Sequence, residues 1–237
     1  MKTVLNQAAT RGRADHGWLQ TRHTFSFADY YDPKRMGFGA LRVLNNDVIA
    51  PSGVFGTHPH RDMEIVTIPL AGALRHADSM GHRQVITAGE VQAMTAGTGI
   101  THSEHNDSDQ HEVSLLQIWI MPREKGLTPR YDQAVFPEVE RRDRWQLLVS
   151  PDGADGSLII NQDARFFRAN LSPGSELSFA AASANHGLYL FVIAGEAETA
   201  GVELRSRDGL AITGVASGNV TAGAPGADVL LIETPMS

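Results

Sequence analysis

The sequence predicts an all-β protein built from small barrels or sandwiches. Its apolar residues fall in short runs of strand length, rich in β-branched and aromatic side chains, as at 65–68, 115–120 and 188–193. Gly, Asn, Asp and Pro separate these runs, and no long amphipathic helical pattern interrupts them. Many short strands divided by turn residues are typical of a β-sandwich or a small barrel.

A weak internal repeat predicts two copies of one unit. Residues 64–72 align with residues 187–195, each a strand-like run that ends in Ala-Gly. Between residues 122 and 163 the pattern loosens into charged and turn-forming stretches, which suit a solvated connection. We therefore expect an N-terminal unit over residues 1–137 and a second unit over residues 138–237.

Composition excludes several classes of function. A chain of 237 residues with 42% hydrophobic content can bury one large core or two small ones. The net charge of -7, from 27 acidic and 20 basic residues, disfavours direct binding of nucleic acid. The absence of cysteine excludes disulfides, thiol nucleophiles and iron–sulfur clusters. Neither a signal peptide nor a membrane span is predicted, so we expect a cytoplasmic protein without membrane contact.

The first chemical motif is a His-x-His pair, His58 and His60, separated by Pro59. On an extended chain, residues two apart project to the same face, so both imidazoles can converge on one ion. A proline cannot donate to a sheet ladder and is tolerated at an edge or at the start of a strand. The motif therefore predicts ligands at the rim of a barrel.

The second motif places His102 and Glu104 at the same spacing, after a glycine-rich turn. Two same-face pairs on neighbouring strands would form a four-ligand metal site. The repeat carries no such residues in its second copy, where Ala181 aligns with His58 and Ser183 with His60. We therefore expect the ion in the N-terminal unit alone.

One alternative carboxylate remains open on these grounds. Glu64 follows His60 by four residues and shares its parity, so it competes with Glu104 as the ligand, and Asp62 shares that parity too. The other histidines lack comparable partner spacing, and we assign them to surface or satisfied core positions: His16, His23, His76, His82, His105, His111 and His186. His23 could approach the mouth of the pocket, but we assign it no role.

Both motifs resemble the paired histidine signatures of the cupin superfamily. Together with the segment 23–33, they are similar to the pirin family, and in particular to bacterial pirin-like quercetin dioxygenases. The resemblance implies a bicupin fold, two stacked jelly-roll (double-stranded β-helix) barrels with few short helices, of which only the first binds metal. It also implies the ligands His58, His60, His102 and Glu104, with iron as the usual ion and quercetin as a substrate.

Three imidazoles and one carboxylate would leave two open positions on an octahedral ion, as oxygen chemistry requires. Fe(II) is the expected ion, with Zn, Mn, Ni, Co or Cu as alternatives. Glu104 would act as ligand and as the base for a flavonol hydroxyl, while O2 is the second substrate. The competing hypothesis is a metal- or redox-responsive regulator that acts through protein–protein contacts. A dry pocket for an aromatic substrate could be lined by Phe25, Phe27, Phe38 and Phe55. Aromatic residues in a β-rich chain are, however, more often part of the core.

Overall fold

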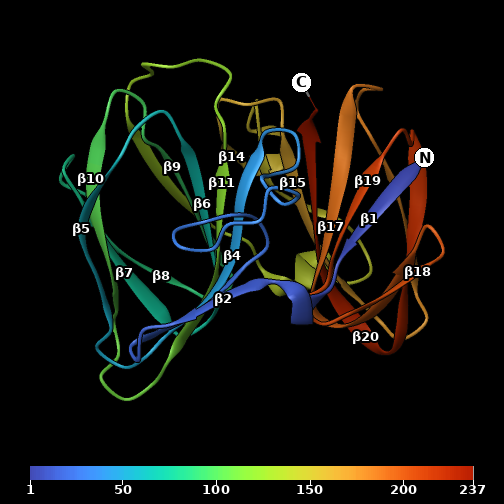
Figure 1. The fold of residues 1–237 in the computed structure, drawn as a ribbon, viewed down its shortest axis with the longest axis horizontal. Helices are drawn as coiled ribbons and strands as arrows, with labels where there is room; N and C mark the ends of the chain where they lie inside the picture. Colours follow the sequence, from blue (N-terminus) through green and yellow to red (C-terminus); the bar gives the residue numbers. More distant parts are fainter. Residues whose placement is uncertain (237) are drawn as a thin grey trace.

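The structure is a computed structural model that describes residues 1–236, and it consists of two β-barrels side by side (Figure 1). Its only helices, within that range, are short 3-10 turns: η1 (Ala8–Thr10), η2 (Glu138–Arg141) and η3 (Ala154–Gly156). The predicted all-β class is confirmed. No helix among the described residues has the length and apolar character needed to cross a membrane.

The first barrel combines a seven-stranded sheet, in the order β12-β9-β6-β11-β4-β3-β2, with a four-stranded sheet, β5-β10-β7-β8. Every pairing within both sheets is antiparallel. Its strands are β2 (Gly12–Asp15), β3 (Leu19–His23), β4 (Leu41–Ile49), β5 (Val54–His60), β6 (Glu64–Ala71), β7 (Ala73–Asp78), β8 (Arg83–Thr87), β9 (Glu90–Thr95), β10 (Ile100–Asn106), β11 (Val113–Ile120) and β12 (Arg130–Val135).

The second barrel is one nine-stranded sheet, in which the long strands β17 and β20 bend and pair along most of their length. Its strands are β1 (Lys2–Asn6), β13 (Gln146–Ser150), β14 (Leu158–Ile159), β15 (Arg165–Leu171), β16 (Glu176–Ala180), β17 (His186–Thr199), β18 (Val202–Arg205), β19 (Gly209–Thr213) and β20 (Ser217–Pro235).

The first strand of the chain belongs to the second barrel. β1 pairs with β19 in register from Lys2 opposite Thr213 to Asn6 opposite Gly209, and Figure 1 shows it among the C-terminal strands. The chain then crosses to the first barrel through η1 and β2. We retain the division after residue 137 as a proposal, with β1 as a strand that the N-terminal unit contributes to the other sheet.

The largest apolar cluster lies between the barrels. Alternate residues of β11, namely Leu116, Ile118 and Ile120, join Phe166 and Phe191 of the second sheet in this cluster. Burying an apolar side chain of this size contributes roughly 1.5–3 kcal/mol. The apolar side of the seven-stranded sheet thus packs against the second barrel and holds the two barrels together.

The interiors of the two barrels differ. The second is filled by a continuous apolar cluster that includes Leu188, Leu190 and Leu231. The interior of the first is divided into two small apolar clusters, around Ile49 and around Met94. Polar side chains separate these clusters, which leaves the first barrel room for a solvent-accessible site.

Candidate metal centre

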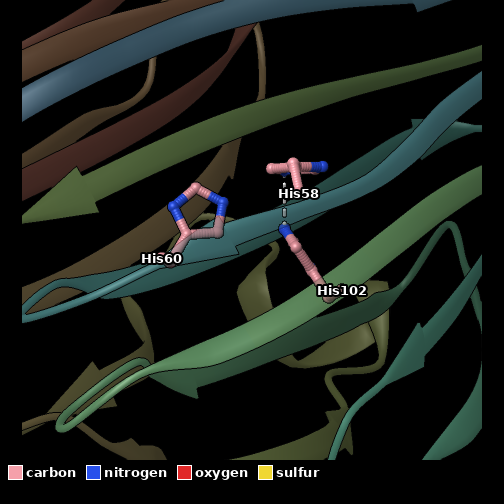
Figure 2. Close-up of side chains that lie close together, drawn as sticks. All are labelled: His58, His60 and His102. Atoms are coloured by element: carbon pink, nitrogen blue, oxygen red, sulfur yellow. Dashed lines mark hydrogen bonds between the residues drawn. The ribbon is translucent and has the colours of Figure 1, made fainter.

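The pairing of β5 with β10 brings the two histidine motifs together. His102 lies opposite His58 in the antiparallel register, and the register shifts between His102 and Glu104. The Nε2 atoms of His58 and His102 are 3.0 Å apart. Figure 2 shows both rings, with that of His60, projecting from adjacent strands toward a common point.

Hydrogen bonds at the far side of each ring indicate which nitrogen carries the proton. Nδ1 of His58 donates to the carbonyl oxygen of Gly56 at 2.8 Å, and Nδ1 of His102 lies 3.4 Å from Nδ1 of His76. These contacts favour the tautomer in which Nε2 offers a lone pair. Two lone pairs that face each other at 3.0 Å repel unless a cation lies between them.

The spacing fits a metal ion with cis nitrogen ligands. With metal–nitrogen bonds of about 2.1 Å, two nitrogens at right angles around an ion are about 3.0 Å apart. The distance between His58 and His102 matches that value. The chemistry of the donors agrees, because neutral imidazoles and a carboxylate suit a divalent transition metal.

His60 is the third member of the group. Its ring centroid lies 4.9 Å from that of His58 and 4.8 Å from that of His102, and ligand nitrogens of all three lie within 4.8 Å of one another. Burial, followed by the neighbouring histidines, lowers the pKa of His60 to about 4 and that of His102 to about 2. Both therefore stay in the neutral form that binds metals.

Glu104 is held by an amide rather than by a cation. The Nε2 group of Gln117 donates to both carboxylate oxygens at 3.2 Å, and the Oε1 atom of Gln117 accepts from Thr67 at 3.1 Å. Burial raises the pKa of Glu104 to about 7, which the Gln117 hydrogen bond partly offsets. A bound cation beside it would favour the ionised form.

The four ligands expected from the sequence form overlapping sets rather than one. His58, His60 and His102 make one group of possible ligands, whereas Glu104 groups with His102 and His76. His102 is common to both. Placing all four around a single ion therefore remains a proposal.

His76 is the residue that the sequence interpretation missed. The sequence interpretation assigns it to a surface or satisfied core position without a role at the site; it is fully buried on β7, opposite Glu104 in the register. Its Nε2 atom lies 3.2 Å from Asp78, and Nδ1 of His82 lies 2.9 Å from the same carboxylate. The His-x-Asp spacing of His76 and Asp78 is a period-two signal that could have identified it.

Glu64 points away from the histidines. Its carboxylate accepts from Thr95 at 2.8 Å and from Asn161 at 3.1 Å, on the side that faces the second barrel. The parity argument that made it a competitor fails because the chain turns at Asp62, where φ is +49°. Parity counted along β5 therefore does not continue into β6.

The histidines open into a cavity of about 530 Å³. Of the four phenylalanines considered from the sequence, Phe27 and Phe55 line it, while Phe25 and Phe38 lie in the cluster between the barrels. Two of the four candidates therefore line the pocket, and the other two are core residues that join the barrels. His23 also lines the cavity, and its Nδ1 is 3.0 Å from the Oδ1 atom of Asn45.

Comparison with known proteins places this site in a family. The model of the family described as "Pirin" matches residues 5–120, and that described as "Quercetinase C-terminal cupin domain" matches residues 147–234. The chain belongs to the pirin family. Its two barrels are the paired cupin barrels of that family, as the resemblance implied.

Relatives of this pirin extend along most of its length. It is 50% identical to a quercetin 2,3-dioxygenase of Escherichia coli strain K12 over 208 residues, 88% of each chain. It is 44% identical to a pirin-like protein of Caulobacter vibrioides, covering 89% of this chain and 90% of the relative. A crystal structure of the bacterial pirin YhhW from Escherichia coli in complex with nickel(II) has 44% identity and a TM-score of 0.94, with 100% of both chains covered.

Proposed function

We propose that this pirin is a metal-dependent dioxygenase that cleaves quercetin or a related flavonol, using O2, at a centre held by His58, His60, His102 and Glu104. The observation that carries the proposal is the pair of facing Nε2 atoms of His58 and His102, 3.0 Å apart in an aromatic-lined cavity. Relatives named quercetin 2,3-dioxygenase support the choice of substrate. Fe(II) is the proposed ion, and the nickel complex of a relative indicates that other divalent ions compete for such a site.

The chain's own residues supply binding, orientation and proton transfer. A bound divalent ion would supply a Lewis acid that lowers the pKa of a coordinated hydroxyl and reacts with oxygen. Trp119, Phe55 and Phe27 line the cavity and would hold a flat aromatic ring. Glu104 would take the proton from the flavonol hydroxyl, because a bound cation would keep its buried carboxylate ionised and able to accept one. Gln117 keeps that carboxylate oriented.

Metal replacement tests the proposal. The protein is freed of metal with a chelator and reloaded in turn with Fe(II), Mn, Ni, Co, Cu or Zn, while quercetin loss and O2 uptake are recorded. We expect turnover only with added ion and the highest rate with Fe(II). Glu104→Gln should retain part of the metal and lose turnover, because an amide cannot accept the proton.

A matched pair of histidine variants controls for general damage. His58→Ala should abolish metal binding and cleavage. His105→Ala removes a half-buried histidine from β10 that takes part in neither ligand group, and it should leave both unchanged. Turnover without any ion, or full turnover in His58→Ala, would refute a metal-dependent dioxygenase at this centre. The absence of turnover with every ion would favour a regulator that acts through protein contacts.

A further inference from the structure

A second cavity, at the junction of the barrels, is lined by basic side chains. It has a volume of about 700 Å³ and no acidic residue among the described residues that line it. Its walls come from η1, β2, β3 and β4 of the N-terminal half and from the turn before β19. We call it the arginine cavity, and its lining residues are Ala8, Ala9, Arg11, Gly12, Arg13, Arg22, Tyr30, Asn46 and Arg207.

Arg11 is a buried cation without a carboxylate partner. The residue is 5% exposed, and among residues 1–236 it forms no ion pair within 4.0 Å. One guanidinium nitrogen, Nη2, donates to the carbonyl oxygens of Arg22 and Leu44 at 2.9 Å and 3.3 Å. Nε and Nη1 have no hydrogen-bond partner in the described part of the chain. Buried guanidinium groups are normally paired, so this is an unusual arrangement.

Arg207 adds a second guanidinium with a free donor. Its Nη1 is buried and has no partner among the residues that the structure describes. Its φ is +72°, in the left-handed region that non-glycine residues rarely adopt. Such a conformation persists only when the surrounding structure holds it in place.

Neighbouring acidic groups are already engaged. The carboxylate of Asp208 accepts from the backbone N–H groups of Ala8 and Arg205. Asp228 forms a two-bond ion pair with Arg168. Neither is within ion-pair distance of Arg11 or Arg207 in the described range. Asp47 acts on Arg11 through its charge but does not line the cavity, so no acidic side chain among the described lining residues neutralises its positive charge.

One interaction partly compensates for the burial of Arg11. Its guanidinium carbon lies 5.2 Å from the centre of the Phe191 ring, which attracts a cation through its π-face. Burial, together with Arg207 and Arg22, lowers the pKa of Arg11 to about 10 against the opposing effects of Tyr189 and Asp47, and the group stays charged at neutral pH. The ring contact does not satisfy the planar N–H donors.

We propose that the arginine cavity binds a small oxyanion ligand, a molecule that carries a carboxylate or phosphate group. Guanidinium forks match both groups through paired hydrogen bonds, and the planar donors of Arg11 and Arg207 are free to form them. Arg22 and Arg13, both exposed at the mouth, supply further positive charge. Because Arg13 and Tyr30 line this cavity and the histidine cavity alike, the two lie next to each other.

Calorimetric titration of the metal-loaded protein tests this site. Inorganic phosphate and sodium benzoate are titrated separately at constant ionic strength, and the anion that saturates identifies the preferred group. The variants are Arg207→Gln and Arg22→Gln. The control is Arg83→Gln, which removes an exposed arginine from β8, away from the cavity. We expect the Kd to rise at least tenfold in Arg207→Gln and severalfold in Arg22→Gln, with Arg83→Gln equal to the wild type.

Thermal unfolding gives a second measurement. The preferred anion should raise the Tm of the wild type and of Arg83→Gln, and the rise should be lost in Arg207→Gln. Should Arg207→Gln fail to fold, Arg22→Gln, whose side chain is exposed, carries the same comparison. The proposal is overturned if neither anion binds the wild type saturably, or if both cavity variants bind as tightly as the control, which would place any anion elsewhere, for example at the metal.

Discussion

Nδ1 of His76 lies 3.4 Å from Nδ1 of His102, so a buried histidine supports a proposed metal ligand from behind. The contact continues through Nε2 of His76 to Asp78 at 3.2 Å, and from Asp78 to the half-buried His82 at 2.9 Å. With Nδ1 of His102 as the donor, Nε2 is left free to face His58. The orientation of the ligand ring thus depends on residues of β7 and on the turn that follows it.

Asp78→Asn should therefore weaken metal binding without removing a ligand. The amide loses the charge that fixes the proton on Nε2 of His76, and replacing partners of ligand histidines typically lowers metal affinity about 10- to 100-fold. The measurement is the Kd for Ni²⁺ or Co²⁺ in a competition titration, together with the ligand-field spectrum of the Co²⁺ form.

A matched control separates this effect from lost stability. Glu233→Gln disrupts another buried carboxylate–histidine contact, 2.8 Å from His186 in the second barrel. It should lower the Tm and leave the metal Kd and the Co²⁺ spectrum unchanged. An Asp78→Asn protein with wild-type affinity and spectrum would show that His76 is merely a packed core residue.

Substitution of Glu104 and of Glu64, the two carboxylates that the sequence left as alternative ligands, should affect metal binding differently. Glu104→Gln should lower metal content because it replaces a proposed ligand. Glu64→Gln should keep it, because the hydrogen bonds of Glu64 to Thr95 and Asn161 run toward the second barrel. Metal analysis after dialysis against limiting Fe(II) provides the comparison. Equal loss in both variants would contradict the assignment of Glu104.

The sequence could predict the fold class and the meeting of the two motifs because both depend on local periodicity. Strand alternation alone places His58 and His60 on one face, and the observed register sets His102 opposite His58. The role of Glu64 could not be read this way, since a single left-handed residue, Asp62, resets the parity. Only the family resemblance favoured Glu104.

Features that depend on tertiary contacts lay beyond the sequence. His76 reaches His102 because β7 pairs with β10, and Arg11 meets Arg207 because β1 crosses to the other barrel. Neither pairing leaves a trace in hydrophobic periodicity. The placement of Phe25 and Phe38 between the barrels likewise requires knowing that one side of the seven-stranded sheet faces a second barrel.

Trp119 should determine affinity for an aromatic substrate. Its ring contacts His60 edge-on with centroids 4.9 Å apart and lies 5.3 Å from Phe27, at the wall of the cavity. Trp119→Leu should raise the KM for quercetin roughly 2- to 10-fold, since an aromatic pair contributes about 0.5–1.5 kcal/mol. The kcat should change less, and Trp119→Phe should restore most of the affinity.

Trp145→Leu is the control for that variant. Trp145 lies in the second barrel, with its ring 6.4 Å from Phe167, and does not line the histidine cavity. Its loss should leave both kinetic constants near the wild type. A fall in kcat alone on replacing Trp119 would instead indicate that the ring orients His60 and does not bind substrate.

Asp47 should make the stability of the fold fall as pH rises. It is buried at the cavity wall, its carboxylate accepts from Thr21 at 2.5 Å, and burial raises its pKa from 3.8 to about 6. Between these values the folded protein retains a proton that the unfolded chain has released, so the free energy of unfolding decreases through this range. The shift of about 2 units corresponds to an upper bound of about 3 kcal/mol.

Asp47→Asn removes this penalty while keeping an acceptor for Thr21. In chelator-treated protein, urea unfolding should give the variant a free energy of unfolding that exceeds the wild-type value at pH 8, and the difference should shrink as the pH falls from 6 to 4. Asp109→Asn removes an exposed carboxylate, and its free energy of unfolding should follow the same pH dependence as that of the wild type across this range. A constant difference for Asp47→Asn would mean that Asp47 stays ionised throughout, stabilised by the field of Arg11.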